Sequence, residues 1–365
     1  MKKILCVMGT RPEAIKMAPV ILALKNEPWA QVKVLATAQH RDLLDQVNGF
    51  FGIIPDIDLN IMQPNQSLTT LTSRLLLELD KVLTTEKPDV VLVQGDTTTV
   101  MSVAMACFYQ HIAVGHIEAG LRTGDMQNPF PEEANRVITS KFSRWHFAPT
   151  EISRQNLLKE GVNSSAIITT GNTVIDALLM AAAQDLAHDL PIDLNRRLIL
   201  ITSHRRENFG EPFKNICTAL RELAENNPMV QFVYPVHPNP NIKLVAHETL
   251  SGLPNFILCA PLDYAPFIAV MKQAHIILTD SGGIQEEAPA LGKPVLVLRE
   301  ETERPEAVAQ GVVKLVGTNH LRIVAEVQNL LDDASCYKSM ARGVSPYGDG
   351  HAAMRIVETL RKHFI

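Results

Sequence analysis

Short apolar runs recur along the chain and are separated by stretches whose apolar positions follow a helical period. Within each run the apolar residues do not alternate with polar ones, which is typical of strands covered on both faces of a parallel sheet. We therefore expect helical crossovers between the runs. The predicted strands are KILCVM, VKVLAT, DVVLVQ, IAVGHIE, WHFAP, AIITTG, LILITS, QFVYPV, FILCAP, IILTDS, PVLVL and VVKLVG.

These strands are too many for one ordinary open sheet, so the chain is expected to divide. The pattern lapses in AAQDLAHDLPIDLNRR, residues 182–197, where Asp, Pro and Asn replace the apolar runs. We predict two doubly wound, Rossmann-like α/β domains, residues 1–182 and 183–348. Their ligand is expected between the carboxyl ends of the two sheets.

Composition narrows the class of protein. The chain has 365 residues, is 46% hydrophobic and 20% charged, and carries a net charge of −5. That charge offers no general attraction to nucleic acid or to an anionic membrane, so we expect neither as a partner. The 5 cysteines are widely spaced without a CxxC pair, which favours buried thiols in a reducing, cytoplasmic compartment.

The sequence contains no clear targeting segment and no metal-binding motif. MKKILCVMG has too short an apolar run for a signal peptide, and no run reaches membrane-spanning length. The 12 histidines form no HExxH motif and no Cys/His cluster, so no metal site is predicted.

The turn after the first predicted strand combines a helix start with two cations. Thr10 is the expected N-cap, with Pro12 in the first turn and Glu13 completing a capping box. Arg11 and Lys16 follow near the helix N-terminus, whose partial positive charge disfavours cations. The arrangement is favourable if an anion binds there.

A dinucleotide cofactor is disfavoured by both first turns. The turn from Gly9 to Glu13 is not GxGxxG, and residues 202–208 contain no glycine before Gly210. We therefore predict no NAD and no other cofactor.

A phosphate-type turn occurs in TDSGGIQEE. Ser281, Gly282 and Gly283 open a predicted helix, where backbone N–H groups and the helix dipole favour an anion. Glu286 and Glu287 follow one turn later and could accept hydrogen bonds from ribose hydroxyls. The alternative is a tight turn whose acidic residues are stabilised by the dipole.

Four further strand or helix ends carry polar side chains. The residues are Asp96; His116, Glu118 and Arg122; Glu132 and Glu133; and His204 and Arg205. Each has a simpler interpretation: Asp96 as a helix cap, Glu132 and Glu133 as dipole-stabilising residues, His204 and Arg205 as a solvated charge cluster. Taken together, cations, a glycine turn and carboxylates indicate an anionic leaving group beside possible bases.

The chain also resembles a known family in motifs from the first strand to the last helix. These are GTRPEAIKMAP, TAQHRDLLDQV, PDIDLNIM, GDTTT, GHIEAGLRTGD, PEEANR, GNTVIDAL, HRREN, LTDSGGIQEEAPALGKPVLVLR, TERPEA and PYGDG. They resemble the bacterial non-hydrolysing UDP-N-acetylglucosamine 2-epimerases.

The resemblance implies a GT-B architecture, a homodimer, and a last helix, residues 349–365, that returns to the first domain. It implies interconversion of UDP-GlcNAc and UDP-ManNAc, which supplies ManNAc units for surface polysaccharide. Without NAD, the remaining route to inversion at C2 is elimination of UDP to 2-acetamidoglucal and re-addition. Which carboxylate removes the proton stays open.

The resemblance also implies roles for individual residues. The implied catalytic residues are Asp96, Glu118, Glu132 and His204. The implied substrate-binding residues are Arg11 and Lys16 in the first domain; Ser281, Gly282, Gly283 and Arg304 on the diphosphate side; Glu287 on the ribose; and Phe267 and the backbone of Leu262 on the uracil. A second, activating UDP-GlcNAc would contact Gln39, His40, Arg205 and His237.

Three other functions are alternatives to the non-hydrolysing epimerase. A hydrolysing epimerase would release ManNAc and UDP, but the resemblance is to the shorter bacterial non-hydrolysing pattern, which has no appended kinase domain. A retaining glycosyltransferase would need an acceptor cleft and would leave Asp96, Glu118 and Glu132 without a role. A non-catalytic nucleotide-sugar sensor would not need these acidic residues.

Overall fold

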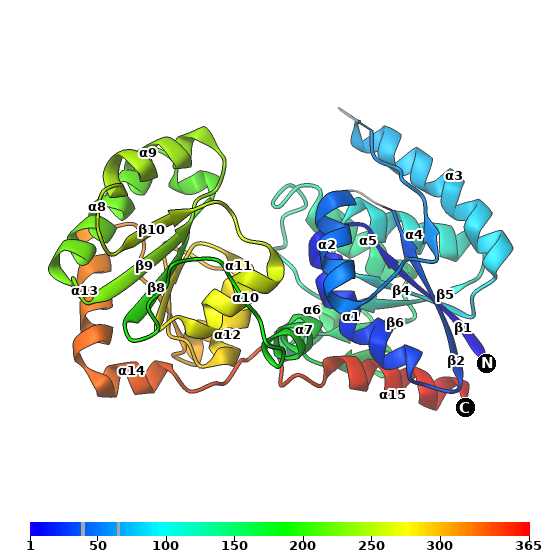
Figure 1. The fold of residues 1–365 in the computed structure, drawn as a ribbon. Coiled ribbons are helices and arrows are strands. Elements are labelled where there is room, and N and C mark those ends of the chain that lie inside the picture. The colour runs from blue at the N-terminus through cyan, green and yellow to red at the C-terminus, as the bar shows by residue number, and fades with distance from the viewer. Residues whose placement is uncertain (38–40, 64–65) are drawn as a thin grey trace. The chain divides into compact units, whose positions relative to one another are not determined.

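The computed structural model describes residues 1–37, 41–63 and 66–365. The chain forms two compact units, one of Met1–Met180 with Tyr347–Ile365 and one of Ala181–Pro346. Figure 1 shows the elements of each unit along the chain. Within the described ranges, no helix is both long enough and apolar enough to cross a bilayer.

The first unit is built on a seven-stranded sheet in the order β3-β2-β1-β4-β5-β6-β7, with parallel pairing throughout. Its strands are β1 (Lys2–Met8), β2 (Ala30–Ala36), β3 (Ile57–Asp58), β4 (Val90–Gln94), β5 (Ala113–Ile117), β6 (Trp145–Ala148) and β7 (Ile167–Thr169). Its helices are α1 (Arg11–Lys25), α2 (Arg41–Phe51), α3 (Leu68–Glu86), α4 (Thr98–Tyr109), α5 (Glu132–Phe142), α6 (Glu151–Lys159), α7 (Thr173–Ala182), which runs into the second unit, and α15 (Ala352–Phe364).

Helices cover the first sheet as the apolar runs predict. Alternate side chains of the central strands, such as Leu5, Val7 and Val91, pack with the leucines of α3 and the valines of α4 in one buried cluster. α1 packs against α2 and α15. A strand with helices on both faces has no position for a polar side chain, so its sequence is continuously apolar.

The second unit contains a six-stranded sheet in the order β10-β9-β8-β11-β12-β13, again with parallel pairing. Its strands are β8 (Arg197–Thr202), β9 (Val230–Pro235), β10 (Phe256–Cys259), β11 (Ile276–Thr279), β12 (Val295–Val297) and β13 (Val313–Leu315). Its helices are α8 (Glu211–Asn226), α9 (Pro240–Leu250), α10 (Tyr264–Gln273), α11 (Gly282–Glu287), α12 (Pro305–Ala309), α13 (His320–Asp332) and α14 (Ala334–Met340).

Two parallel doubly wound sheets, with the last helix returning to the first unit, confirm the predicted fold class. The sequence pattern did not predict strand β3. β3 has two residues and pairs with Leu35 and Ala36 of β2. A segment of this length leaves no apolar run, because its pairing depends on the neighbouring strand rather than on its own sequence.

Each sheet has a point where the strand order reverses. In the first unit this point lies between β1 and β4, and in the second between β8 and β11. The loops that leave two such strands run to opposite faces of the sheet, which opens a crevice at their carboxyl ends. The predicted site residues Asp96 and Ser281 lie directly after two of these four strands.

Candidate functional site

The turn between β1 and α1 has the predicted helix start. Thr10 is the N-cap of α1, and the capping box with Glu13 is present. The Glu13 carboxylate accepts hydrogen bonds from Gly9 N at 2.5 Å and Thr10 N at 2.8 Å. This arrangement fixes the direction in which α1 leaves the sheet, and so the positions of Arg11 and Lys16.

Glu13 also joins this turn to the neighbouring one. Thr97, after β4, donates its hydroxyl to Glu13 Oε1 at 2.5 Å. Burial raises the pKa of Glu13, the three hydrogen bonds oppose that rise, and the charge of nearby Asp96 adds to it. A buried carboxyl therefore holds together the two loops that flank the reversal point of the first sheet.

Lys16 contacts Glu118 across this crevice. The ammonium lies 2.6 Å from Oε1 and 2.8 Å from Oε2 of the carboxylate, and both side chains are largely buried. Glu118 follows β5 and has a φ of 65°, a left-handed conformation that a residue with a side chain rarely adopts. The unusual backbone turns this carboxylate to the end of the sheet.

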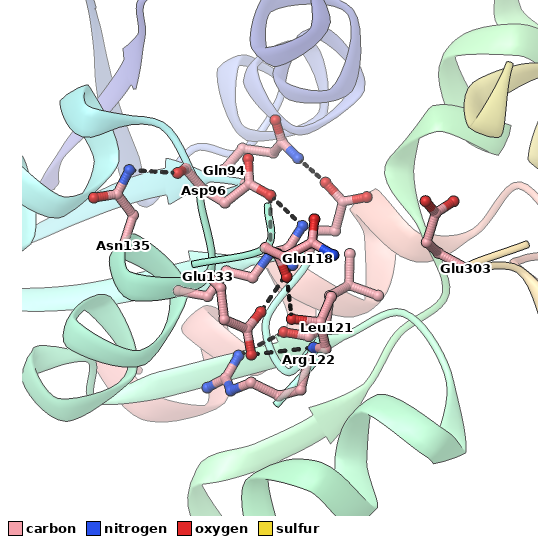
Figure 2. A network of polar contacts seen from close by, with 12 residues as sticks. Gln94, Asp96, Glu118, Leu121, Arg122, Glu133, Asn135 and Glu303 are labelled. Carbon is pink, nitrogen blue, oxygen red and sulfur yellow. Dashed lines mark hydrogen bonds and ion pairs between the residues drawn. The ribbon is translucent and has the colours of Figure 1, made fainter. Parts of the chain in front are cut away.

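Two amides also contact the carboxylate of Glu118. Gln94, the last residue of β4, donates to Oε2, and Asn172 donates to Oε1 at 2.9 Å. Figure 2 shows Gln94 beside this carboxylate. With N–H donors on both oxygens, Glu118 is placed as an acceptor.

Asp96 is paired with Arg136. Its Oδ2 lies 2.7 Å from Nη2 and 2.9 Å from Nε of the guanidinium, which belongs to α5. Thr97, and not Asp96, caps α4, so the interpretation of Asp96 as a helix cap is wrong. Two N–H groups of one guanidinium thus converge on a single oxygen and fix the position of Oδ2.

Arg136 is itself held by Glu133. Its Nη1 lies 3.0 Å from Glu133 Oε2, and Glu133 Oε1 accepts from the backbone N–H groups of Thr123 and Gly124. Glu133 is buried in this network (Figure 2). Glu132 is the first residue of α5, at the predicted helix start, and is half-buried.

The other two polar residues near the end of β5 have structural partners. His116 Nε2 lies 2.7 Å from Gly95 O, and burial lowers its pKa to about 3. Arg122 contacts the Glu160 carboxylate at 2.6 and 2.9 Å. A neutral buried imidazole and a paired guanidinium account for these residues without a ligand.

In the second unit, Asp280 joins the loops at the reversal point. This fully buried carboxylate accepts from the backbone N–H groups of His204 and Arg205, from the Ser203 hydroxyl and from the Asn208 amide, at 2.9–3.1 Å. It holds the loop after β8 beside the turn after β11.

The Ser281-Gly282-Gly283 turn follows at once and opens α11. A Cβ added at Gly282 would lie 3.8 Å from Arg205 Nη2 and 3.9 Å from Arg304 Nη2. Both guanidinium groups therefore flank the turn, and Arg304 is positioned by an ion pair with Glu286. Two cations beside backbone N–H groups can bind an anionic group.

The remaining predicted residues of this unit lie as follows. The His204 and His237 rings stack with their centroids 5.7 Å apart. Burial lowers the pKa of His204, and the negative charge of Asp280 opposes that change.

Glu287 is buried, and its charge adds to the burial that raises the pKa of Tyr264. Phe267 on α10 and Leu262 before it are half-buried.

The structure thus brings Lys16 to Glu118 and places Asp96 at the adjacent strand end in one unit. In the other it brings Arg205 and Arg304 to the glycine turn. Gln39 and His40 lie outside the described residues. Among the residues described, no group of three or more His, Cys, Asp or Glu could hold a metal ion.

Sequence reasoning missed the residues that position these groups. They are Gln94, Arg136, Asn172 and, in its role as acceptor for the loop after β8, Asp280. All four lie in or beside the motifs quoted above. A polar residue within an otherwise apolar run, such as Gln94, is a usable signal, because a buried amide requires a partner.

Comparison with known proteins shows the family of the chain. The family model described as UDP-N-acetylglucosamine 2-epimerase matches residues 22–361. The chain belongs to the UDP-N-acetylglucosamine 2-epimerase family. It is 55% identical to the Escherichia coli K12 UDP-N-acetylglucosamine 2-epimerase over 373 residues, covering 100% of this chain and 99% of that protein.

Two solved structures are similar over almost the whole chain. UDP-GlcNAc 2-epimerase from Neisseria meningitidis bound to UDP-GlcNAc is 52% identical with a TM-score of 0.89, over 99% of this chain and 100% of that one. A UDP-N-acetylglucosamine 2-epimerase, described as putative, from Listeria monocytogenes is 46% identical with a TM-score of 0.95, over 100% and 97%. The predicted family and the predicted enzyme class, an epimerase, are confirmed.

Proposed function

We propose that this epimerase interconverts UDP-GlcNAc and UDP-ManNAc by eliminating UDP across the C1–C2 bond and adding it back. The observation that carries the proposal is the Lys16–Glu118 pair, a buried carboxylate held as an acceptor beside the strand end of Asp96. Inversion at C2 requires a base for a weakly acidic proton and stabilisation of the departing diphosphate.

The first unit supplies the groups that transfer protons. Asp96, Glu118 and Glu132 act on C2 from the ends of β4 and β5 and the start of α5. The Arg136 and Lys16 cations fix the first two carboxylates. Arg11, exposed in the first turn of α1, contributes charge to the developing anion.

The second unit supplies the groups that hold UDP. The diphosphate binds at the turn of Ser281, Gly282 and Gly283, with His204 and Arg304 beside it. Glu287 accepts hydrogen bonds from the ribose, Phe267 packs on the uracil, and the backbone at Leu262 contacts the uracil edge. The bound UDP-GlcNAc in the Neisseria meningitidis structure supports this class of ligand.

The mechanism is tested in deuterated water. Elimination and re-addition place deuterium at C2 of both UDP-ManNAc and recovered UDP-GlcNAc, and release traces of UDP and 2-acetamidoglucal. NMR of the reaction mixture measures both. Complete retention of the C2 proton would contradict the mechanism, stoichiometric ManNAc and UDP would indicate the hydrolysing alternative, and absence of turnover would indicate a sensor.

We further propose that the protein acts as a cytoplasmic homodimer whose UDP-ManNAc supplies ManNAc units to surface polysaccharide, as the family resemblance implies. Sedimentation equilibrium tests the dimer. A gene deletion that leaves the ManNAc content of the surface polysaccharide unchanged would contradict the metabolic role.

A second UDP-GlcNAc is proposed to activate the enzyme through Gln39, His40, Arg205 and His237. His237 is exposed and stacks on His204. Arg205 lies beside Gly282. A ligand on Arg205 and His237 would adjoin the proposed diphosphate site, which supports coupling between the two.

A further inference from the structure

Two motifs, GNT and PYGDG, have no part in the chemistry above, yet they meet at Asn172. The chain re-enters the first unit at Tyr347. Residues 347–353, the C-terminal strap, then run past Gly171 and Asn172 and end in the first turn of α15. Asn172 N donates to Tyr347 O at 2.5 Å.

The strap packs closely on this segment. A Cβ added at Gly171 would lie 3.2 Å from Gly348 Cα, and one added at Gly348 would lie 3.4 Å from both N and O of Asn172. Asp176 of α7 accepts from the backbone N–H groups of Ala352 at 3.2 Å and Ala353 at 2.8 Å. The strap is therefore anchored on both sides of Asn172.

Both polar atoms of the Asn172 side chain make hydrogen bonds. Its Oδ1 accepts from Val174 N at 3.1 Å, and its Nδ2 donates to Glu118 Oε1 at 2.9 Å. Since Oδ1 faces an N–H donor, the amide has one consistent orientation, with its NH2 group toward the carboxylate. Asn172 is 3% exposed, so this geometry is held by protein contacts on all sides.

We propose that Asn172 is a positioning residue for Glu118, and that the C-terminal strap holds Asn172 in place. The left-handed backbone of Glu118 sets where its side chain leaves the chain, and the contacts of its carboxylate set the orientation of the two oxygens. Lys16 and Gln94 hold it from α1 and β4, and Asn172 holds it from the segment that the strap covers. This inference rests on the proposed catalytic role of Glu118.

Two substitutions separate positioning from folding. Asn172→Ser and Asn172→Asp both keep an oxygen that can cap Val174 N, and both keep the backbone bond to Tyr347. Each removes the N–H donor to Glu118, and Asp adds a repelling charge. We expect kcat to fall about tenfold for Ser and more for Asp, with KM and UDP affinity changed by less than about threefold.

Asn163→Ser is the matched control, because Asn163 bonds Ser165 within a short turn. Its kcat is expected to equal that of the unaltered protein, and urea unfolding checks that all variants fold. Glu118→Gln is measured in parallel. If Glu118→Gln keeps normal turnover, the proposed function fails together with the inference; if it loses turnover while both Asn172 variants keep it, only the inference is overturned.

The strap is tested by a double-mutant cycle. Gly348→Val places methyl groups against the Asn172 backbone, so kcat should fall by itself but not further in the Asn172→Ser background. Equal losses in both backgrounds would show that the strap does not act through Asn172.

Discussion

The Lys16 ammonium contacts both carboxylate oxygens of Glu118, at 2.6 and 2.8 Å, although the two residues are 102 positions apart in the chain. Lys16 stands near the N-terminus of α1, where the helix dipole disfavours a cation. The buried carboxylate offsets that cost before any substrate binds. The sequence predicts that Lys16 faces an anionic ligand. In the structure Lys16 contacts Glu118, the proposed catalytic carboxylate.

Lys16→Met should therefore lower turnover through Glu118. We expect kcat to fall at least about tenfold, because a charge-assisted contact to a partly buried carboxylate is lost. Steady-state kinetics with UDP-GlcNAc measures it. Lys25→Met, an exposed change in the last turn of the same helix, is the control. Unchanged kcat in Lys16→Met would show that the pair serves stability alone.

Arg136 should matter as the partner of Asp96. Arg136→Lys keeps the charge but loses the paired N–H groups that converge on Asp96 Oδ2, so we expect about a tenfold loss of turnover, and a greater loss for Arg136→Gln. Arg154→Gln on α6, which breaks an exposed pair with Glu151, should leave turnover unchanged. Equal effects of Lys and Gln at position 136 would contradict the geometric role.

Asp280→Asn should affect the second unit. An amide has one acceptor oxygen, which would take the place of Oδ2, the acceptor for Arg205 N. Its NH2 would then replace Oδ1 and face the N–H group of His204. We expect a loss of about 2–3 kcal/mol in the free energy of unfolding and weaker UDP binding. Urea unfolding and UDP titration measure both. Asp185→Asn, an exposed change in the segment after α7, should change neither.

His116 should make the protein less stable in acid. Burial lowers its pKa from 6.5 to about 3, so below pH 6.5 the unfolded chain binds a proton that the folded one does not. The free energy of unfolding should fall as the pH drops from 6.5 toward 3, by up to about 1.4 kcal/mol per pH unit for this residue.

His116→Gln keeps a donor for Gly95 O and removes that titration. Urea unfolding at pH 7, 6 and 5 should show a shallower pH dependence than the unaltered protein, by up to about one proton. His351→Gln, an exposed site, is the control. The same slope in both variants would show that His116 titrates normally.

The proposed second site predicts a lag. From pure UDP-ManNAc, the reverse reaction should start slowly and accelerate as UDP-GlcNAc forms, and a trace of added UDP-GlcNAc should abolish the lag. His237→Ala should lengthen the lag while the final rate changes less. An immediate, linear rate that trace UDP-GlcNAc leaves unaffected would mean that no activating site operates.

The local features of this protein could be predicted from the sequence alone. A strand covered on both faces must be apolar at every position, so β1 and β11 are visible as runs. The capping box of Thr10 and Glu13 depends on residues three apart, and the start of α5 at Glu132 on two preceding prolines. Each of these signals is complete within a few residues.

Tertiary structure decided which side chains are partners. Asp96 and Arg136 are 40 positions apart, and Glu118 and Asn172 are 54 apart. They meet because β4, β5, β6 and β7 are neighbours in the sheet and end at the same edge. Strand order depends on how the helices between strands pack, and each helix has an apolar face that several neighbours could cover. The sequence therefore predicted which strand ends carry acidic groups, whereas the cation or amide that orients each one followed only from the fold.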